Sequence, residues 1–90
     1  MVTELTTLLN CLDEIYDELV KSGKIDSAQF FLKHRVEIDK MRNDPNKLKD
    51  VIRDLTTCRA MAQYANFSLK EEALLDEVVS SSSACLHNIP

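Results

Sequence analysis

The sequence contains one glycine, two prolines and no tryptophan among its 90 residues. Strand reversals in sandwiches and barrels depend on turn residues, so this scarcity argues against a turn-rich all-β fold. It also argues against a disordered chain, because such chains are enriched in glycine and proline. The length suits a single domain of residues 1–90, in which chain-length scaling predicts that about 64% of the surface is buried.

Long hydrophobic runs are also lacking. Apolar residues occur only a few at a time, whereas a bilayer-spanning helix needs about 20. Glu4 stands where a signal peptide has positive charge. Cys11, Cys58 and Cys85 are odd in number and form no C-x-x-C pair, which favours reduced thiols. We therefore expect a cytoplasmic protein with no membrane partner.

The residue patterns of common catalytic and metal sites are missing too. The two histidines, His34 and His87, lie in no zinc or di-iron spacing, and one glycine cannot build a phosphate-binding loop. Each cysteine lies on or beside an apolar stripe, as expected for a small buried hydrophobe. We therefore expect no enzyme, no catalytic residues, no metal and no cofactor.

Helical periodicity is the strongest pattern that is present. Apolar residues recur at helical spacing in four segments, at about 3–22, 27–42, 45–65 and 69–86. Gly23 follows the first segment as a left-handed C-terminal residue would. The connections of two to five residues make successive helices antiparallel neighbours. The sequence thus predicts an all-α fold, a small up-down-up-down four-helix bundle.

Three helix starts carry capping signals. Asp26 with Gln29 resembles a capping box at the second helix, and Asp44-Pro45 reads as the N-cap and first residue of the third. Ser68 and Glu71 form an S-x-x-E capping box at the fourth.

Acidic residues are concentrated in the first and last helices. Residues 1–23 carry a net charge of −4 and residues 67–90 carry −3, against +1 for 24–44 and +2 for 45–66. The first and fourth helices of such a bundle are antiparallel neighbours, so their acidic halves adjoin. Either this surface is simply solvated, with Arg59 as a candidate partner, or it binds a basic protein. The candidate partner-binding residues are Asp13, Glu14, Asp17, Glu18, Glu71, Glu72, Asp76 and Glu77.

The second helix has an unusually wide apolar arc. The helical wheel places His34 and Arg35 within it, beside Leu32 and Val36. Either this helix is packed centrally, with His34 bonded to a carbonyl, or Leu32, Arg35 and Val36 form a contact patch for a partner or a second copy.

The segment at residues 64–72 has the sequence Tyr-Ala-Asn-Phe-Ser-x-x-Glu-Glu. In this segment, in overall length and in helix layout, the chain resembles the small, acidic, all-helical immunity proteins of bacterial polymorphic and contact-dependent inhibition toxin systems. The resemblance implies binding of one cognate toxin, often a basic nuclease. The alternatives are a homodimeric helical adaptor or regulatory module, and a regulator that binds nucleic acid through the basic stretch from Lys40 to Arg53. The net charge of −4 argues against the last.

Overall fold

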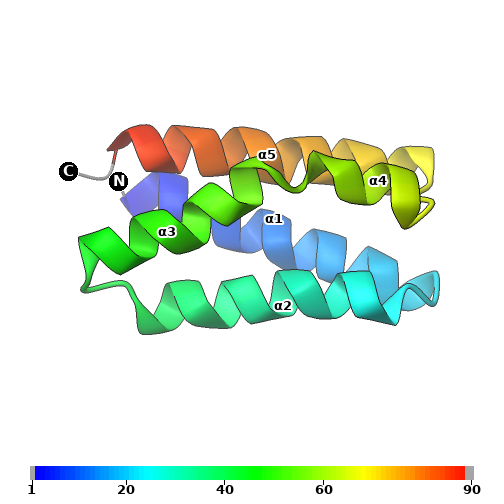
Figure 1. Cartoon of the computed structure of the whole chain (residues 1–90), viewed down its shortest axis with the longest axis horizontal. Coiled ribbons are helices and arrows are strands. Elements are labelled where there is room, and N and C mark those ends of the chain that lie inside the picture. Colours follow the sequence, from blue (N-terminus) through cyan, green and yellow to red (C-terminus); the bar gives the residue numbers. More distant parts are fainter. Residues whose placement is uncertain (1, 89–90) are drawn as a thin grey trace.

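The computed structural model describes residues 2–88 and shows an all-α four-helix bundle (Figure 1). The expected up-down-up-down order of the four arms is confirmed, and the third arm is interrupted. The elements are α1 (Val2–Lys21), α2 (Ile25–Lys40), α3 (Pro45–Thr56), the 3-10 turn η1 (Cys58–Ala60), α4 (Met61–Tyr64) and α5 (Leu69–Asn88).

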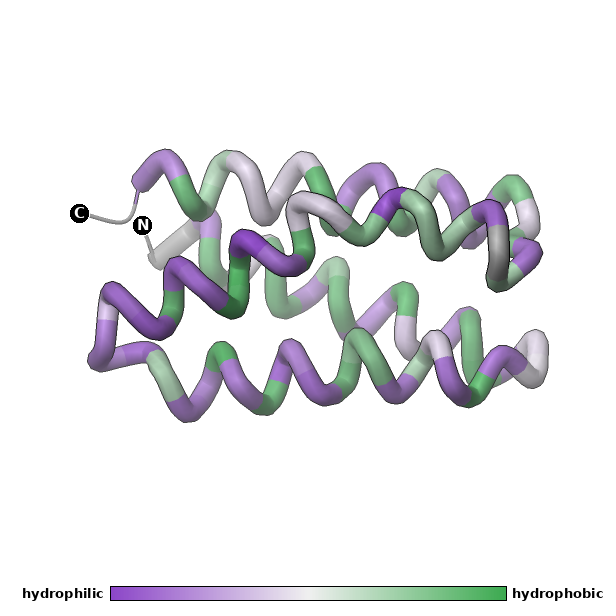
Figure 2. The backbone as a smooth tube through the Cα atoms, in the orientation of Figure 1, coloured by the Kyte–Doolittle hydropathy of each residue, from purple (hydrophilic) through white to green (hydrophobic). Residues whose placement is uncertain are grey.

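The arms pack as a closed ring around one core. Helix α1 packs against α5 and α2, and α3 packs against α5 and, less extensively, α2. The α1–α5 and α2–α3 seams therefore lie on opposite sides of the bundle. Apolar and polar residues alternate along the helices (Figure 2). The largest apolar side chains with almost no exposure are Leu8, Leu12, Ile15, Leu19, Phe31, Ile38, Leu48, Ile52, Leu55, Leu75 and Val78.

The turn between α1 and α2 has the geometry expected from its glycine. Gly23 has a φ of +79°, and its N–H donates to the Val20 carbonyl at 3.1 Å. The N–H of Lys24 donates to the Leu19 carbonyl at 2.8 Å. These two bonds form a Schellman motif, which satisfies the last carbonyls of α1.

We expect Gly23→Ala to lower the free energy of unfolding by about 1 kcal/mol, because left-handed backbone is unfavourable for a residue with a Cβ. Beyond the adjoining residues, no atom lies within 4 Å of the added methyl group, so the loss comes from the backbone. Chemical denaturation measures it. Gly23→Asn, which tolerates this conformation better, should lose less, and equal losses in the two variants would contradict the explanation.

The predicted capping box formed by Asp26 and Gln29 at the start of the second helix is wrong. Helix α2 begins at Ile25, its N-cap is Lys24, and no side chain caps it. The Schellman motif leads directly into the helix, since the Ala28 N–H already donates to the Lys24 carbonyl at 3.0 Å. Asp26 therefore lies inside α2 and cannot be its N-cap. The helix spans residues 25–40 instead of about 27–42.

The other two helix starts follow their sequence signals. The Asp44 carboxylate accepts from the Lys47 N–H at 3.3 Å, with Pro45 as the first helical residue. Ser68 and Glu71 form the reciprocal capping box, in which the Ser68 N–H donates to Glu71 Oε1 at 2.8 Å and the Glu71 N–H donates to Ser68 Oγ at 3.2 Å.

The single third helix expected at 45–65 is also wrong, because the helix breaks at Thr57. Three successive side chains there donate to carbonyls three residues earlier: Thr56 to Arg53 at 2.7 Å, Thr57 to Asp54 at 3.1 Å and Cys58 to Leu55 at 3.0 Å. Such bonds compete with the helical pattern. The chain tightens into η1 and α4, and Asn66, with a φ of 60°, ends the arm. Beyond the break, η1 and α4 lean away from α2 and toward α5 (Figure 1).

Candidate functional site

The eight candidate carboxylates divide into paired and unpaired groups. Each pair joins a carboxylate of α1 or α5 to a basic residue on another segment. They are Asp13 with Arg35 at 2.6 Å, Glu18 with Lys70 at 3.2 Å, Glu71 with Lys24 at 2.9 Å and Asp76 with Arg59 at 3.7 Å. Within residues 2–88, Glu14, Asp17, Glu72 and Glu77 have no ion-pair partner within 4 Å.

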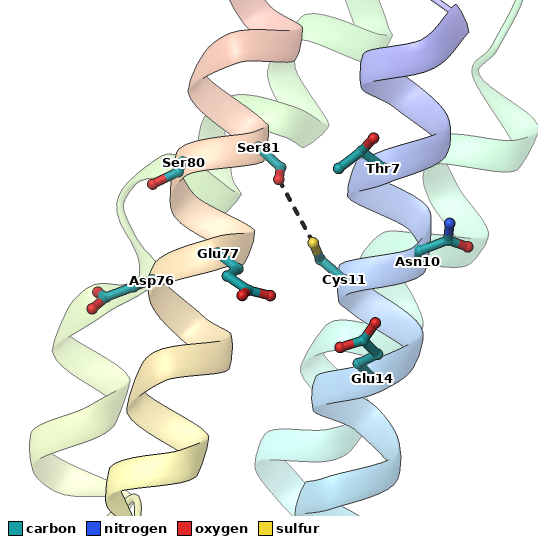
Figure 3. A pocket seen from close by; sticks show the side chains of 8 residues that line it. All are labelled: Thr7, Asn10, Cys11, Glu14, Asp76, Glu77, Ser80 and Ser81. Atoms are coloured by element: carbon teal, nitrogen blue, oxygen red, sulfur yellow. Dashed lines mark hydrogen bonds between the residues drawn. The ribbon is translucent and has the colours of Figure 1, made fainter.

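Two of the unpaired carboxylates meet in a groove along the α1–α5 seam. The groove has a volume of about 590 Å³. Glu77 of α5 extends into the space between the helices, Glu14 lies in front of α1, and Asp76 and Asn10 stand on the outer edges (Figure 3). We call this feature the acidic groove; its lining residues are Thr7, Asn10, Cys11, Glu14, Asp76, Glu77, Ser80 and Ser81.

Small side chains form the middle of the acidic groove. Cys11 and Ser81 face each other across the seam, with Sγ and Oγ 3.6 Å apart (Figure 3). Burial raises the pKa of the Cys11 thiol, the hydrogen bond with Ser81 opposes this, and the charges of Glu77 and Glu14 raise the pKa further. The thiol is therefore neutral, and its surroundings carry the negative potential of the two carboxylates.

A second hollow continues the negative surface toward the α1–α2 turn. It is formed by Glu14, Asp17, Glu18, Lys21, Lys70 and Leu74, with a volume of about 220 Å³. Glu14 lines both hollows. Lys70 pairs with Glu18 here, whereas Glu14 and Asp17 have no ion-pair partner among residues 2–88.

Glu71 lies outside this surface. Its side chain is 1% exposed, and its carboxylate accepts from the Ser22 hydroxyl, from Lys24 Nζ and from the Ser68 N–H. Burial favours a higher pKa, but these hydrogen bonds and the charge of Lys24 outweigh it and lower the pKa to about 2. Glu71 thus joins the α1–α2 turn to the start of α5, and it is too buried to contact a partner protein.

The contact patch on α2 is only partly exposed. Leu32 and Val36 are 40% and 42% exposed, and Arg35 is held by Asp13 at 2.6 Å and Asp39 at 2.7 Å. His34 is buried, with Nδ1 2.8 Å from the Phe30 carbonyl, as expected for a centrally packed helix. A protein–protein interface uses about 20–30 residues a side, so this patch alone is too small for a stable homodimer.

Within residues 2–88, no three His, Cys, Asp or Glu side chains are grouped as metal ligands, and no helix combines the length and hydrophobicity needed to cross a membrane. No protein-family model, curated protein or solved structure matches the chain.

Proposed function

We propose that this chain is a non-catalytic, immunity-type inhibitor that binds a basic protein toxin, such as a nuclease, through the acidic groove. The observation that carries the proposal is the convergence of Glu14 and Glu77, without cationic partners among the described residues, on one groove between α1 and α5. Asp76 adds a third carboxylate, and its pairing with Arg59 at 3.7 Å is exposed and weak.

The chemistry of the groove suits an arginine- or lysine-rich surface. Carboxylates accept hydrogen bonds from a guanidinium group in paired geometry, and the hydroxyl groups of Thr7, Ser80 and Ser81 provide additional acceptors. In a nuclease, the basic surface that meets these groups would be the one that otherwise binds phosphates. Occupying it would block the substrate.

The dimensions are also adequate. A standard interface covers ~800 Å² per partner, which is about 15% of the 5320 Å² surface of this protein. The α1–α5 face extends along two 20-residue helices, so it can supply this area with the acidic groove near its centre. Charge complementarity of this kind chiefly raises the association rate.

Co-expression tests the proposal. The C-terminal domain of the protein encoded next to this chain's gene is induced in a bacterial host, alone or together with this chain. We expect growth arrest with the neighbour alone and normal growth when both are present, with the two proteins co-purifying. A neighbour that is harmless, or a toxic neighbour that this chain neither binds nor neutralises, would contradict the proposal.

A further inference from the structure

A second groove lies on the opposite side of the bundle, where the third arm breaks. It lies between α2 and the α3–η1 junction and has a volume of about 450 Å³. This size is in the range of small-molecule sites. The groove lies at the break at Thr57, beyond which the third arm leans toward α5 (Figure 1).

One end of this groove is polar and built around a buried imidazole. The side chain of His34 is 8% exposed. Its Nδ1 lies 2.8 Å from the Phe30 carbonyl, and a carbonyl only accepts, so Nδ1 carries a hydrogen. In neutral His34, Nε2 therefore has a free lone pair. This atom lies 3.6 Å from Asp54 Oδ2, which is too far for a direct hydrogen bond.

The rest of the groove combines the apolar side chains of Phe30, Cys58, Ala60 and Met61 with Thr57 and Lys33. The Phe30 ring packs on the His34 imidazole with centroids 4.3 Å apart, and Cys58 and Met61 are buried beside the groove. Burial raises the pKa of the Cys58 thiol to about 11, against the lowering effects of a backbone hydrogen bond and Arg59, so the thiol is uncharged. Lys33 lies at the rim, 74% exposed and 4.0 Å from Glu37.

We propose that this groove binds a small aromatic amine. The ammonium group lies between His34 Nε2 and Asp54 Oδ2 and donates a hydrogen bond to each of them. The aromatic ring packs on Phe30 and Met61, which line the same groove. The proposal is independent of the toxin-binding function, because the α1–α5 and α2–α3 seams face opposite sides.

Titration of the isotope-labelled protein with phenethylamine, followed by NMR, tests this site. We expect saturable shifts at residues 30–34 and 54–61, with a dissociation constant on the order of 1 mM. The anionic analogue 3-phenylpropionate should bind at least about tenfold more weakly, because its carboxylate meets Asp54.

Two matched variants separate the site from general charge effects. Asp54→Asn should weaken phenethylamine binding at least about tenfold, whereas Asp50→Asn, one turn away and 76% exposed, should leave it unchanged. Both side chains are exposed, so both variants should fold, which circular dichroism checks. No saturable shift up to about 20 mM phenethylamine, equal affinity in Asp54→Asn, or equal binding of 3-phenylpropionate would overturn the proposal.

Discussion

Replacing Glu71 with alanine is expected to lower the free energy of unfolding by about 3 kcal/mol. The substitution removes acceptors for the Ser22 hydroxyl, for Lys24 Nζ at 2.9 Å and for the Ser68 N–H at 2.8 Å. Lys24 is only 25% exposed, so its charge loses its partner in a partly desolvated position. For a domain of this size, whose total stability is about 5–13 kcal/mol, this loss is large.

The same carboxylate should make stability depend on pH in acid. Its pKa is about 2 in the folded protein against an ordinary value of 4.5, which corresponds to roughly 3 kcal/mol. The folded pKa is depressed, so this stabilisation is complete above pH 4.5 and is lost as the pH falls toward 2. Urea denaturation at pH 7, 4.5 and 2.5 measures it, and Glu71→Gln should lack this part of the acid dependence.

Glu72→Ala is the matched control, because Glu72 is adjacent, exposed and without an ion pair among residues 2–88. It should change the free energy of unfolding by no more than about 0.5 kcal/mol. Similar losses in Glu71→Ala and Glu72→Ala would show that the buried network does not stabilise the fold.

Reversing two charges in the acidic groove should abolish most of the affinity for the toxin partner. In Glu14→Lys/Glu77→Lys, two attractive carboxylates become two repulsive cations at the proposed contact. We expect about 100-fold weaker binding at physiological salt, measured by calorimetry with the partner identified by co-expression. Neither residue has an ion pair to lose in the described part of the chain, so the variant should fold.

A second double variant separates the groove from the net charge. Asp26→Lys/Asp50→Lys makes the same change in net charge at exposed positions on α2 and α3, away from the acidic groove. It should lose no more than about threefold in affinity. Equal losses in the two variants would indicate that overall charge, and not the acidic groove, determines binding.

The fold was predictable wherever the decisive interactions are local. Gly23 was correctly expected to end α1, since positive φ favours glycine, and Asp44 and Ser68 bond to backbone atoms three residues away. The break at Thr57 was missed because Cys58 and Met61 continue the apolar pattern inward. Its cause was nevertheless visible in the sequence, as successive Thr and Cys side chains able to bond back to the helix.

The site was predictable only in outline. The topology was enough to expect acidic α1 and α5 to adjoin, which the structure confirms. Arg59, expected as a candidate partner, pairs with Asp76 at 3.7 Å. Which other carboxylates remain unpaired depends on helix rotation and on long-range pairs such as Glu18 with Lys70. Hydrophobic periodicity does not determine these details. The acidic groove on the α1–α5 seam therefore includes Glu14, Asp76 and Glu77 and not all eight candidate carboxylates.

The most direct test of the acidic groove is the association rate with the purified toxin domain as a function of ionic strength. Screening lengths fall from about 30 Å at 0.01 M salt to about 3 Å at 1 M. We predict a steep fall in the association rate for the native protein and for Asp26→Lys/Asp50→Lys, and a much flatter dependence for Glu14→Lys/Glu77→Lys. The same dependence in all three proteins would contradict an electrostatic role for the α1–α5 groove.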